Sequence, residues 1–271
     1  MKRKLFWFIG LICFISTCYG QCGFVLGKID TIKSRQLQEA RILNIYLPEG
    51  YSANSANKYP VIYLLDGSAN EDFIHIAGVT QFLNLIDTLP KVIIVGIANI
   101  DRKRDFTFPT TIAKDKKDYP TTGGSEKFMD FIEKDLQPYI ERKYRTSGSK
   151  TLIGQSLGGL LATEILLKKP GLFTNYCIVS PSLWWDNESL LQKASDLIKK
   201  MPATYTKIYI AVGNEEQQMQ QDAKKLSGLL QKFGSRNLKV TYNYMPYENH
   251  LTILHNSIYK GLEILNAGRN F

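Results

Sequence analysis

The chain has 271 residues, of which 44% are hydrophobic and 22% charged, and its formal net charge is +9. This length suits one large α/β domain, and the hydrophobic share is enough for a packed core, which argues against a disordered chain. No lysine and arginine cluster with interleaved aromatic residues indicates nucleic-acid binding. Without a CxxC pair or metal-ligand spacing, the sequence predicts no metal site and no need for a cofactor.

Residues 1–20 have the character of a signal peptide. A basic MKRK is followed by a short apolar run and by small residues at the positions that a signal peptidase reads. This pattern predicts cleavage before Gln21 and export to the periplasm or the medium. The run is too short for a comfortable membrane span, so we expect no stable span after cleavage. A lipoprotein anchor at Cys18 is a weaker alternative because Thr17 is a poor residue before a lipidated cysteine.

Loss of residues 1–20 would also change the charge and the cysteine count of the chain. The mature chain stays mildly basic, which suits an anionic substrate but is explained as simply by a solvated basic surface. Two of the four cysteines, Cys22 and Cys177, would remain. Export permits a disulfide between them, whereas the apolar surroundings of Cys177 favour a buried free thiol, and the two interpretations stay open.

Residues 21–271 are predicted to form a single domain in which strands and helices alternate. After a first extended segment at 24–30, strands are predicted at 40–48, 59–67, 91–99, 151–155, 175–182, 207–214 and 238–246. Helices are predicted at 71–87, from Ser125 to a kink or break at Pro138, and at 158–169, 188–200, 216–232 and 251–266. The alternation predicts a mostly parallel sheet with helices on both faces, and the first two extended segments suit an antiparallel edge.

The segment 101–124 interrupts this alternation. It is charged, contains proline and ends in glycine, so it is predicted to be a long loop. Long loops inside compact domains are often functional, and this one is a candidate lid.

Gly154-Gln155-Ser156-Leu157-Gly158 matches G-x-S-x-G between a predicted strand and a predicted helix. This is the nucleophile elbow of the α/β-hydrolase fold, in which glycines allow a strained serine backbone. The turn also aims the helix N-terminus and the amide of Leu157 at a developing oxyanion. We therefore predict an α/β-hydrolase fold without a large separate cap, with Ser156 as nucleophile; an ordinary turn serine is the alternative.

A serine nucleophile needs a histidine base, and the base follows the serine in this fold. Of the three histidines, His75 precedes the serine, His255 falls inside the last helix, and His250 lies in the loop after the last strand. His250 is the preferred base, with His255 as the alternative. The orienting acid is expected directly after the penultimate strand, where Glu216 is preferred and Glu215 is the alternative.

The loop after an early strand is expected to give the second oxyanion donor. In YLLDGSANED, Gly67 permits a close backbone approach and the amide of Ser68 is the predicted donor. Asp66 is either a plain turn residue or an acceptor that holds the loop.

Several stretches together resemble the esterase D-like putative esterase family of α/β hydrolases, most of all its siderophore esterase branch. They are YPVIYLLDG, IANIDRKRDFTFP, GGSEKFMDFIEKDLQPYIERKY, LIGQSLGGLLATEILLKKPGLFTNYCIVSPSLWW, VGNEE and ENH. The resemblance covers about residues 35–266. It implies the same nucleophile, base, acid and oxyanion amides, and it places Gln155 where the family often has histidine.

The resemblance implies a small-molecule ester substrate, aromatic or anionic in character. In the functional interpretation, Trp184 and Trp185 stack on an aromatic acyl group, Arg104 meets an anionic ring, and Gln155 and Gly67 border the ester. In the simpler interpretation, the tryptophans cover a strand end and the arginine forms surface ion pairs. The leading prediction is a catecholate siderophore esterase. An acetyl or feruloyl carbohydrate esterase and a non-catalytic binding protein on a hydrolase scaffold are the alternatives.

Overall fold

The computed structural model of the chain describes residues 23–267. The predicted signal peptide, its cleavage site and Cys22 lie outside the described residues. Within them, no helix is both long and apolar enough to cross a bilayer.

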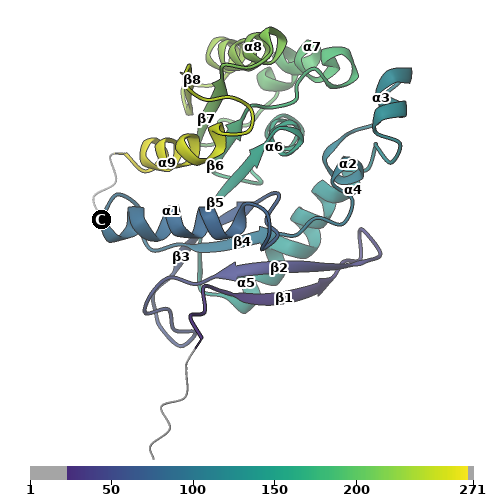
Figure 1. Cartoon of the computed structure of the whole chain (residues 1–271). Coiled ribbons are helices and arrows are strands. Elements are labelled where there is room, and N and C mark those ends of the chain that lie inside the picture. Colours follow the sequence, from purple (N-terminus) through teal and green to yellow (C-terminus); the bar gives the residue numbers. More distant parts are fainter. Residues whose placement is uncertain (1–22, 268–271) are drawn as a thin grey trace, which may run out of the picture.

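An eight-stranded sheet in the order β1-β2-β4-β3-β5-β6-β7-β8 forms the centre of the fold (Figure 1). The strands are β1 (Lys28–Lys33), β2 (Ala40–Tyr46), β3 (Tyr59–Leu64), β4 (Ile93–Ile97), β5 (Thr146–Gln155), β6 (Asn175–Val179), β7 (Thr206–Gly213) and β8 (Leu238–Met245). Strand β2 runs antiparallel to β1 and to β4, and the other pairs are parallel. The predicted mostly parallel sheet with an antiparallel edge is confirmed.

Helices cover both faces of this sheet (Figure 1). They are α1 (Phe73–Leu85), α2 (Arg102–Phe106), α3 (Ala113–Asp118), α4 (Ser125–Asp130), the π-helical turn η1 (Phe131–Leu136), α5 (Gln137–Lys143), α6 (Leu157–Lys168), α7 (Trp185–Lys199), α8 (Gln217–Phe233) and α9 (Ile253–Asn266). The described residues contain no separate cap domain.

The alternation of side chains along the strands creates a core on each face. In β3, Val61 and Tyr63 point to one core, which α6, α7 and α8 cover together with the α4–α5 segment. Ile62 and Leu64 point to the other core, which α1 and α9 cover. Because neighbouring residues of a strand face opposite ways, a strand buried on both sides appears as the unbroken apolar run seen in the sequence.

The helix at Pro138 differs from its prediction. A kink or break was expected there, but the chain stays helical through η1 into α5, and Pro138 stands in the first turn of α5. Proline lacks an amide hydrogen and its ring disturbs the α-helical ladder, and a π-helical turn directly before it accommodates this locally.

The segment 101–124 also differs from a plain loop, since it contains α2 and α3. The side chain of Asp101 caps α2 by accepting a hydrogen bond from the amide of Arg104 at 3.0 Å. An aspartate cap of this kind stabilises a helix too short to show a periodic pattern, so the apolar spacing could not predict it.

The carboxyl ends of β3, β5, β6, β7 and β8 meet at one edge of the sheet because these strands are parallel. The loops that carry the predicted site residues therefore start from the same edge, where ligands bind in open α/β sheets.

Candidate functional site: a serine elbow facing a histidine–glutamate pair

Ser156 lies at a strained bend between β5 and α6. Its φ of 58° and ψ of −119° lie outside the regions that non-glycine residues usually occupy. The bend is held by hydrogen bonds from the Ser156 amide to the carbonyl of Val179 at 3.0 Å and from the Ser182 amide to the carbonyl of Ser156 at 3.0 Å. Such strain costs about 1–3 kcal/mol and persists where the surrounding structure enforces it.

Close packing requires glycine at the first position of the motif and directly after it. A Cβ atom at Gly154 would lie 2.4 Å from the carbonyl oxygen of Gly158, and one at Gly159, the residue after the motif, would lie 2.9 Å from the Cα atom of Pro181. The strand and the helix can therefore approach at this angle only without side chains there. The sequence prediction of an elbow at Ser156 agrees with this geometry.

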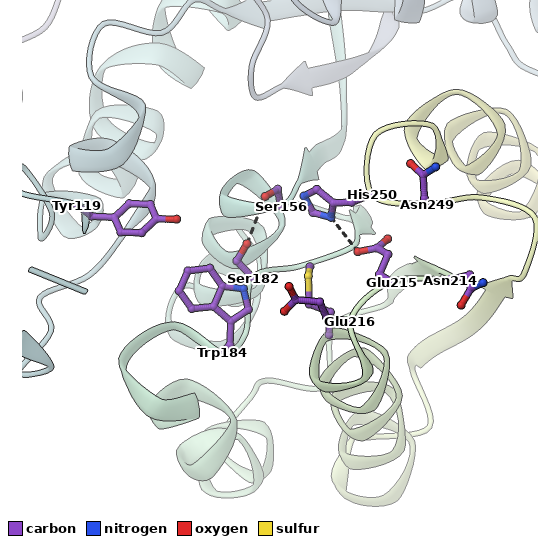
Figure 2. A pocket seen from close by; sticks show the side chains of 10 residues that line it. Tyr119, Ser156, Ser182, Trp184, Asn214, Glu215, Glu216, Asn249 and His250 are labelled. Carbon is purple, nitrogen blue, oxygen red and sulfur yellow. Dashed lines mark hydrogen bonds and ion pairs between the residues drawn. The ribbon is translucent and has the colours of Figure 1, made fainter. Parts of the chain in front are cut away.

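The ring of His250 lies between Ser156 and Glu215 (Figure 2). Its Nδ1 atom is 2.8 Å from Oε2 of Glu215. The carbonyl of His250 accepts a hydrogen bond from the Gln155 side chain at 2.6 Å, which ties the histidine loop to the elbow. The Oγ atom of Ser156 is 3.3 Å from Oγ of Ser182. Nδ1 is thus committed to the glutamate, and Nε2 is the ring nitrogen left for the serine.

Glu215 is buried and well supplied with donors. Its side chain is 2% exposed, whereas that of His250 is 36% exposed. Its Oε1 atom accepts hydrogen bonds from the hydroxyl of Ser180 and, at 3.1 Å, from the amide of Gly213. Burial acts to raise the pKa of Glu215, but the hydrogen bonds from His250 and Ser180 hold this pKa below its usual value. A carboxylate of this kind stays charged and can orient an imidazole.

The preference for Glu216 as the partner of His250 is corrected by the structure. Glu216 is exposed at the N-terminus of α8, and Glu215, the alternative, contacts the histidine. The reason is the packing after β7: a Cβ atom at Gly213 would lie 2.6 Å from the carbonyl oxygen of Glu248, so the chain there runs against the histidine loop. The side chain of Glu215 folds back under that loop. Gly213 is the sequence signal that could have favoured Glu215.

The alternative base, His255, lies elsewhere. Its ring packs edge-to-face on that of His75, with ring centroids 3.8 Å apart, so it joins α9 to α1. Neither ring lines the pocket that contains Ser156.

The two predicted oxyanion amides are in different states. Leu157 is the first residue of α6, so its amide has no acceptor within the helix. The amide of Ser68 donates to Oε2 of Glu71 at 3.2 Å. Gly67 packs closely as expected, since a Cβ atom there would lie 2.4 Å from the Cα atom of Gly96. The Ser68 amide is therefore engaged by a carboxylate, a contact that no local sequence pattern indicates.

Asp66 holds the loop of Ser68 in place. Its two carboxylate oxygens accept hydrogen bonds from Nε and Nη2 of Arg102 at 2.6 and 2.8 Å, and Oδ1 accepts another from Asn99 at 2.7 Å. Arg102 also donates to the carbonyl of Gln155 at 3.3 Å, which connects this loop to the elbow. Of the two interpretations of Asp66, the structure agrees with an acceptor that fixes the loop.

Arg104 does not reach the pocket. Its Nη2 atom lies 2.7 Å from Glu39 and its Nε atom 2.8 Å from Asp105, which also pairs with the buried Arg41. These ion pairs tie α2 to β2 and its preceding turn. The expected contact of Arg104 with an anionic ring is therefore not present in this arrangement, and the simpler interpretation of structural ion pairs fits.

The two tryptophans separate into different roles. Trp185 is fully buried and donates from Nε1 to the carbonyl of Phe108 at 2.9 Å. Trp184 is partly exposed and lines the pocket, as does Tyr119 from the segment 101–124 (Figure 2). Their ring centroids are 6.1 Å apart. Tyr119 was not predicted, because nothing in its local sequence shows that the segment folds back toward Ser156.

These groups surround a pocket of about 520 Å³ that opens beside Ser156. Its lining consists of Tyr119, Ser156, Ser182, Trp184, Asn214, Glu215, Glu216, Met219, Asn249 and His250. Cys177 does not line this pocket. It is a buried free thiol in β6, and its burial raises its pKa to about 12. Residues 23–267 hold no group of three or more His, Cys, Asp or Glu side chains placed to bind a metal.

A serine on a strand–helix elbow, a histidine–carboxylate pair beside it and a mostly parallel sheet are the defining features of the α/β-hydrolase fold. Comparison with known proteins narrows this class. The chain belongs to the putative esterase family, whose model matches residues 34–256. The protein is therefore an ester hydrolase by family.

Individual relatives and solved structures agree with this family. The chain is 32% identical to the ferri-bacillibactin esterase BesA of Bacillus subtilis over 241 residues, which cover 80% of this chain and 82% of that protein. An IroE-like serine hydrolase from Shewanella oneidensis superposes with a TM-score of 0.80 at 34% identity, over 89% of this chain and 80% of that one. The BES protein from Bacillus cereus superposes with a TM-score of 0.80 at 30% identity, over 91% and 98%.

Proposed function

We propose that the protein is a serine esterase in which Ser156, His250 and Glu215 form the catalytic triad. The observation that carries this proposal is the hydrogen bond of 2.8 Å between His250 and Glu215 beside a strained serine elbow. A buried carboxylate that accepts from Nδ1 fixes the tautomer in which Nε2 takes the serine proton.

The reaction proceeds through an acyl-enzyme. Oγ of Ser156 attacks the ester carbonyl carbon while His250 Nε2 takes its proton. The amide of Leu157 donates to the oxyanion, and the amide of Ser68 joins it once Glu71 has released that amide. Collapse of the tetrahedral intermediate expels the alcohol, which receives the proton from His250. Water activated by His250 then hydrolyses the acyl-enzyme.

The proposed substrate is a catecholate siderophore ester or a related aryl ester. The names of the relatives support a siderophore substrate, since one at 32% identity is a ferri-bacillibactin esterase. The pocket supports an aromatic acyl group, because Tyr119 and Trp184 line it close to Ser156. Aromatic side chains hold planar ligands by offset or edge-to-face contacts. Feruloyl esters of carbohydrates are the second candidate, favoured by the same aromatic lining.

Hydrolysis rates on a small ester panel test this proposal. The panel contains p-nitrophenyl acetate and butyrate, methyl ferulate, and iron-free and ferric enterobactin, each measured with the chain from Gln21 onward and with its Ser156→Ala variant. We expect fast, Ser156-dependent cleavage of the catecholate ester and slow cleavage of ferulate. A preference for ferulate would favour the second candidate. Absence of Ser156-dependent cleavage of every ester would contradict the esterase proposal.

We also propose that the chain is exported after removal of residues 1–20. The support is the basic, apolar and small-residue pattern of this segment. Mass spectrometry of the protein made with its full N-terminus in a bacterial host should find a mature chain that starts at Gln21. An intact N-terminus, or a lipidated Cys18, would contradict this cleavage.

A further inference from the structure

The pocket beside Ser156 carries negative charge that no lining residue balances. Two carboxylates, Glu215 and Glu216, belong to its described lining, and no lysine or arginine does. Glu215 is engaged by His250, Ser180 and Gly213. The charge of Glu216 is the one that a bound ligand would meet directly.

Glu216 stands at the N-cap of α8, but its side chain has no partner among the described residues. Within residues 23–267, its carboxylate forms no hydrogen bond or ion pair, and it does not cap α8, although it precedes that helix. It is exposed, and it lines the pocket that contains Ser156 and Trp184 (Figure 2). An unpaired carboxylate at a pocket wall favours hydrogen-bond donors and cations and disfavours anions.

The cations expected to offset this charge are committed elsewhere. Arg102 is paired with Asp66, and Arg104 with Glu39 and Asp105. Lys103 donates to the carbonyl of Asp118 and lies over the ring of Tyr119, with Nζ 4.8 Å from the ring centroid, but it is not part of the lining.

We infer that Glu216 is a specificity-determining residue that makes the site select against negatively charged acyl groups. The inference rests on the proposed esterase function. For a catecholate ester it means preference for the iron-free form, whose phenolic hydroxyls can donate hydrogen bonds to the carboxylate. In the ferric complex those oxygens are deprotonated, and their charge outweighs that of the metal ion.

A pair of esters that differ in charge tests this inference. p-Nitrophenyl valerate and p-nitrophenyl hemiglutarate have the same leaving group and nearly the same acyl length, but only the second ends in a carboxylate. The readout is the ratio of kcat/KM for the anionic ester to kcat/KM for the neutral one. Because both values come from one preparation, the ratio does not depend on how much of a variant is correctly folded.

Glu216→Gln should raise this ratio roughly three- to tenfold, the effect of removing one nearby charge in mostly aqueous surroundings. The difference should shrink at high salt. Glu49→Gln is the matched control, because it removes the same charge at the amino ends of the parallel strands, whereas the pocket lies at their carboxyl ends. Glu49 follows the end of β2, where Tyr46 pairs with Ile94 near the start of β4. The ratio of the two kcat/KM values in Glu49→Gln should equal that of the wild type.

The outcomes separate this inference from the proposed function. An unchanged ratio in Glu216→Gln, with Ser156-dependent hydrolysis of the neutral ester intact, would overturn the inference and leave the esterase proposal standing. Equal rises in both variants would attribute selectivity to the net charge of the protein and also overturn it. If the wild type showed no Ser156-dependent hydrolysis of either ester, the esterase proposal itself would be contradicted. Iron-free and ferric enterobactin give a second pair of substrates. The ratio of kcat/KM for the ferric form to kcat/KM for the iron-free form should rise in Glu216→Gln and stay unchanged in Glu49→Gln.

Discussion

The two sides of the site differ in how far their polar groups are already arranged for the proposed chemistry. On the histidine side, Glu215 receives its hydrogen bonds from His250, Ser180 and Gly213, and each of these serves to orient the imidazole. On the oxyanion side, one of the two proposed donors, the amide of Ser68, donates to Glu71. The proposed base is therefore already oriented, whereas the Ser68 amide would have to exchange an internal carboxylate for the substrate.

The difference has an electrostatic origin. The oxyanion side brings Asp66, Glu71 and Asp72 close to a single guanidinium, Arg102. Asp66 accepts hydrogen bonds from two nitrogens of that guanidinium, Nε and Nη2, and Glu71 is held instead by the Ser68 amide and by Asn99. Backbone amides that suit a carboxylate also suit an oxyanion. The loop is therefore held in shape by the same donor that catalysis would use.

The largest effect is expected at the nucleophile. Ser156→Ala should lower kcat on p-nitrophenyl butyrate by about 10³-fold or more, since it removes the hydroxyl that the elbow holds beside His250. A fluorophosphonate label should attach to the wild type and not to this variant. Retained turnover or labelling would place the nucleophile elsewhere. A fold check by circular dichroism serves as the control.

The next effect separates the two adjacent glutamates. Glu215→Gln should lower kcat by about 10²- to 10⁴-fold, because the amide can no longer hold the histidine in the required tautomer. Glu216→Gln changes the neighbouring residue in the same way and should cost at least about tenfold less on a neutral ester. Losses of equal size in the two variants would contradict the assignment of Glu215 as the acid.

A smaller effect is expected on the oxyanion side. Glu71→Ala frees the Ser68 amide, so kcat should rise several-fold, while the free energy of unfolding should fall by about 1 kcal/mol through the lost hydrogen bonds. Urea unfolding and initial rates measured on the same preparation check the two effects. A fall in kcat would mean that Glu71 is needed to keep the loop in its catalytic shape.

The smallest effect concerns pH and stability. Burial and the charges of Asp66 and Glu71 raise the pKa of Asp72 to about 7 from its usual 3.8. Between these values the folded state binds more protons than the unfolded state, so this group's stabilising contribution falls as pH rises and is lost above the folded-state pKa. Asp72 makes no side-chain cap hydrogen bond to α1, so Asp72→Asn removes the charge without removing a cap.

We therefore expect Asp72→Asn to raise Tm relative to the wild type at about pH 8, with a smaller difference at about pH 5. The Tm of both proteins, measured by calorimetry across this range, gives the answer. An equal difference at both pH values would show that Asp72 does not titrate with a raised pKa.

The parts of the molecule that the sequence predicted are those set by short-range patterns. The strands 59–67 and 91–99 are apolar runs because both of their faces are buried, and the elbow at Ser156 is defined by glycines within a few residues. Both patterns involve residues close together in the chain, and such residues determine the local backbone conformation. The family resemblance added the leading substrate class.

The predictions that failed depend on contacts between distant segments. Arg104 was assigned to the substrate from its place in a charged segment, but Glu39 and Asp105 bind it across the antiparallel edge. Tyr119 was missed because its approach to Trp184 needs the fold of a segment with no periodic pattern. Ion pairs and aromatic contacts of this kind are formed by residues far apart in the chain, so no local pattern records them.

By itself, the sequence determined the α/β class, the antiparallel edge and the position of the serine elbow, since apolar periodicity and glycine spacing act locally. Only the tertiary structure decided which of two adjacent glutamates meets His250, and that the Ser68 amide is held by Glu71. Adjacent residues in a loop can point in opposite directions, and their choice depends on what packs against them. Here the close approach of Gly213 to Glu248 turns Glu215 inward and leaves Glu216 facing the pocket.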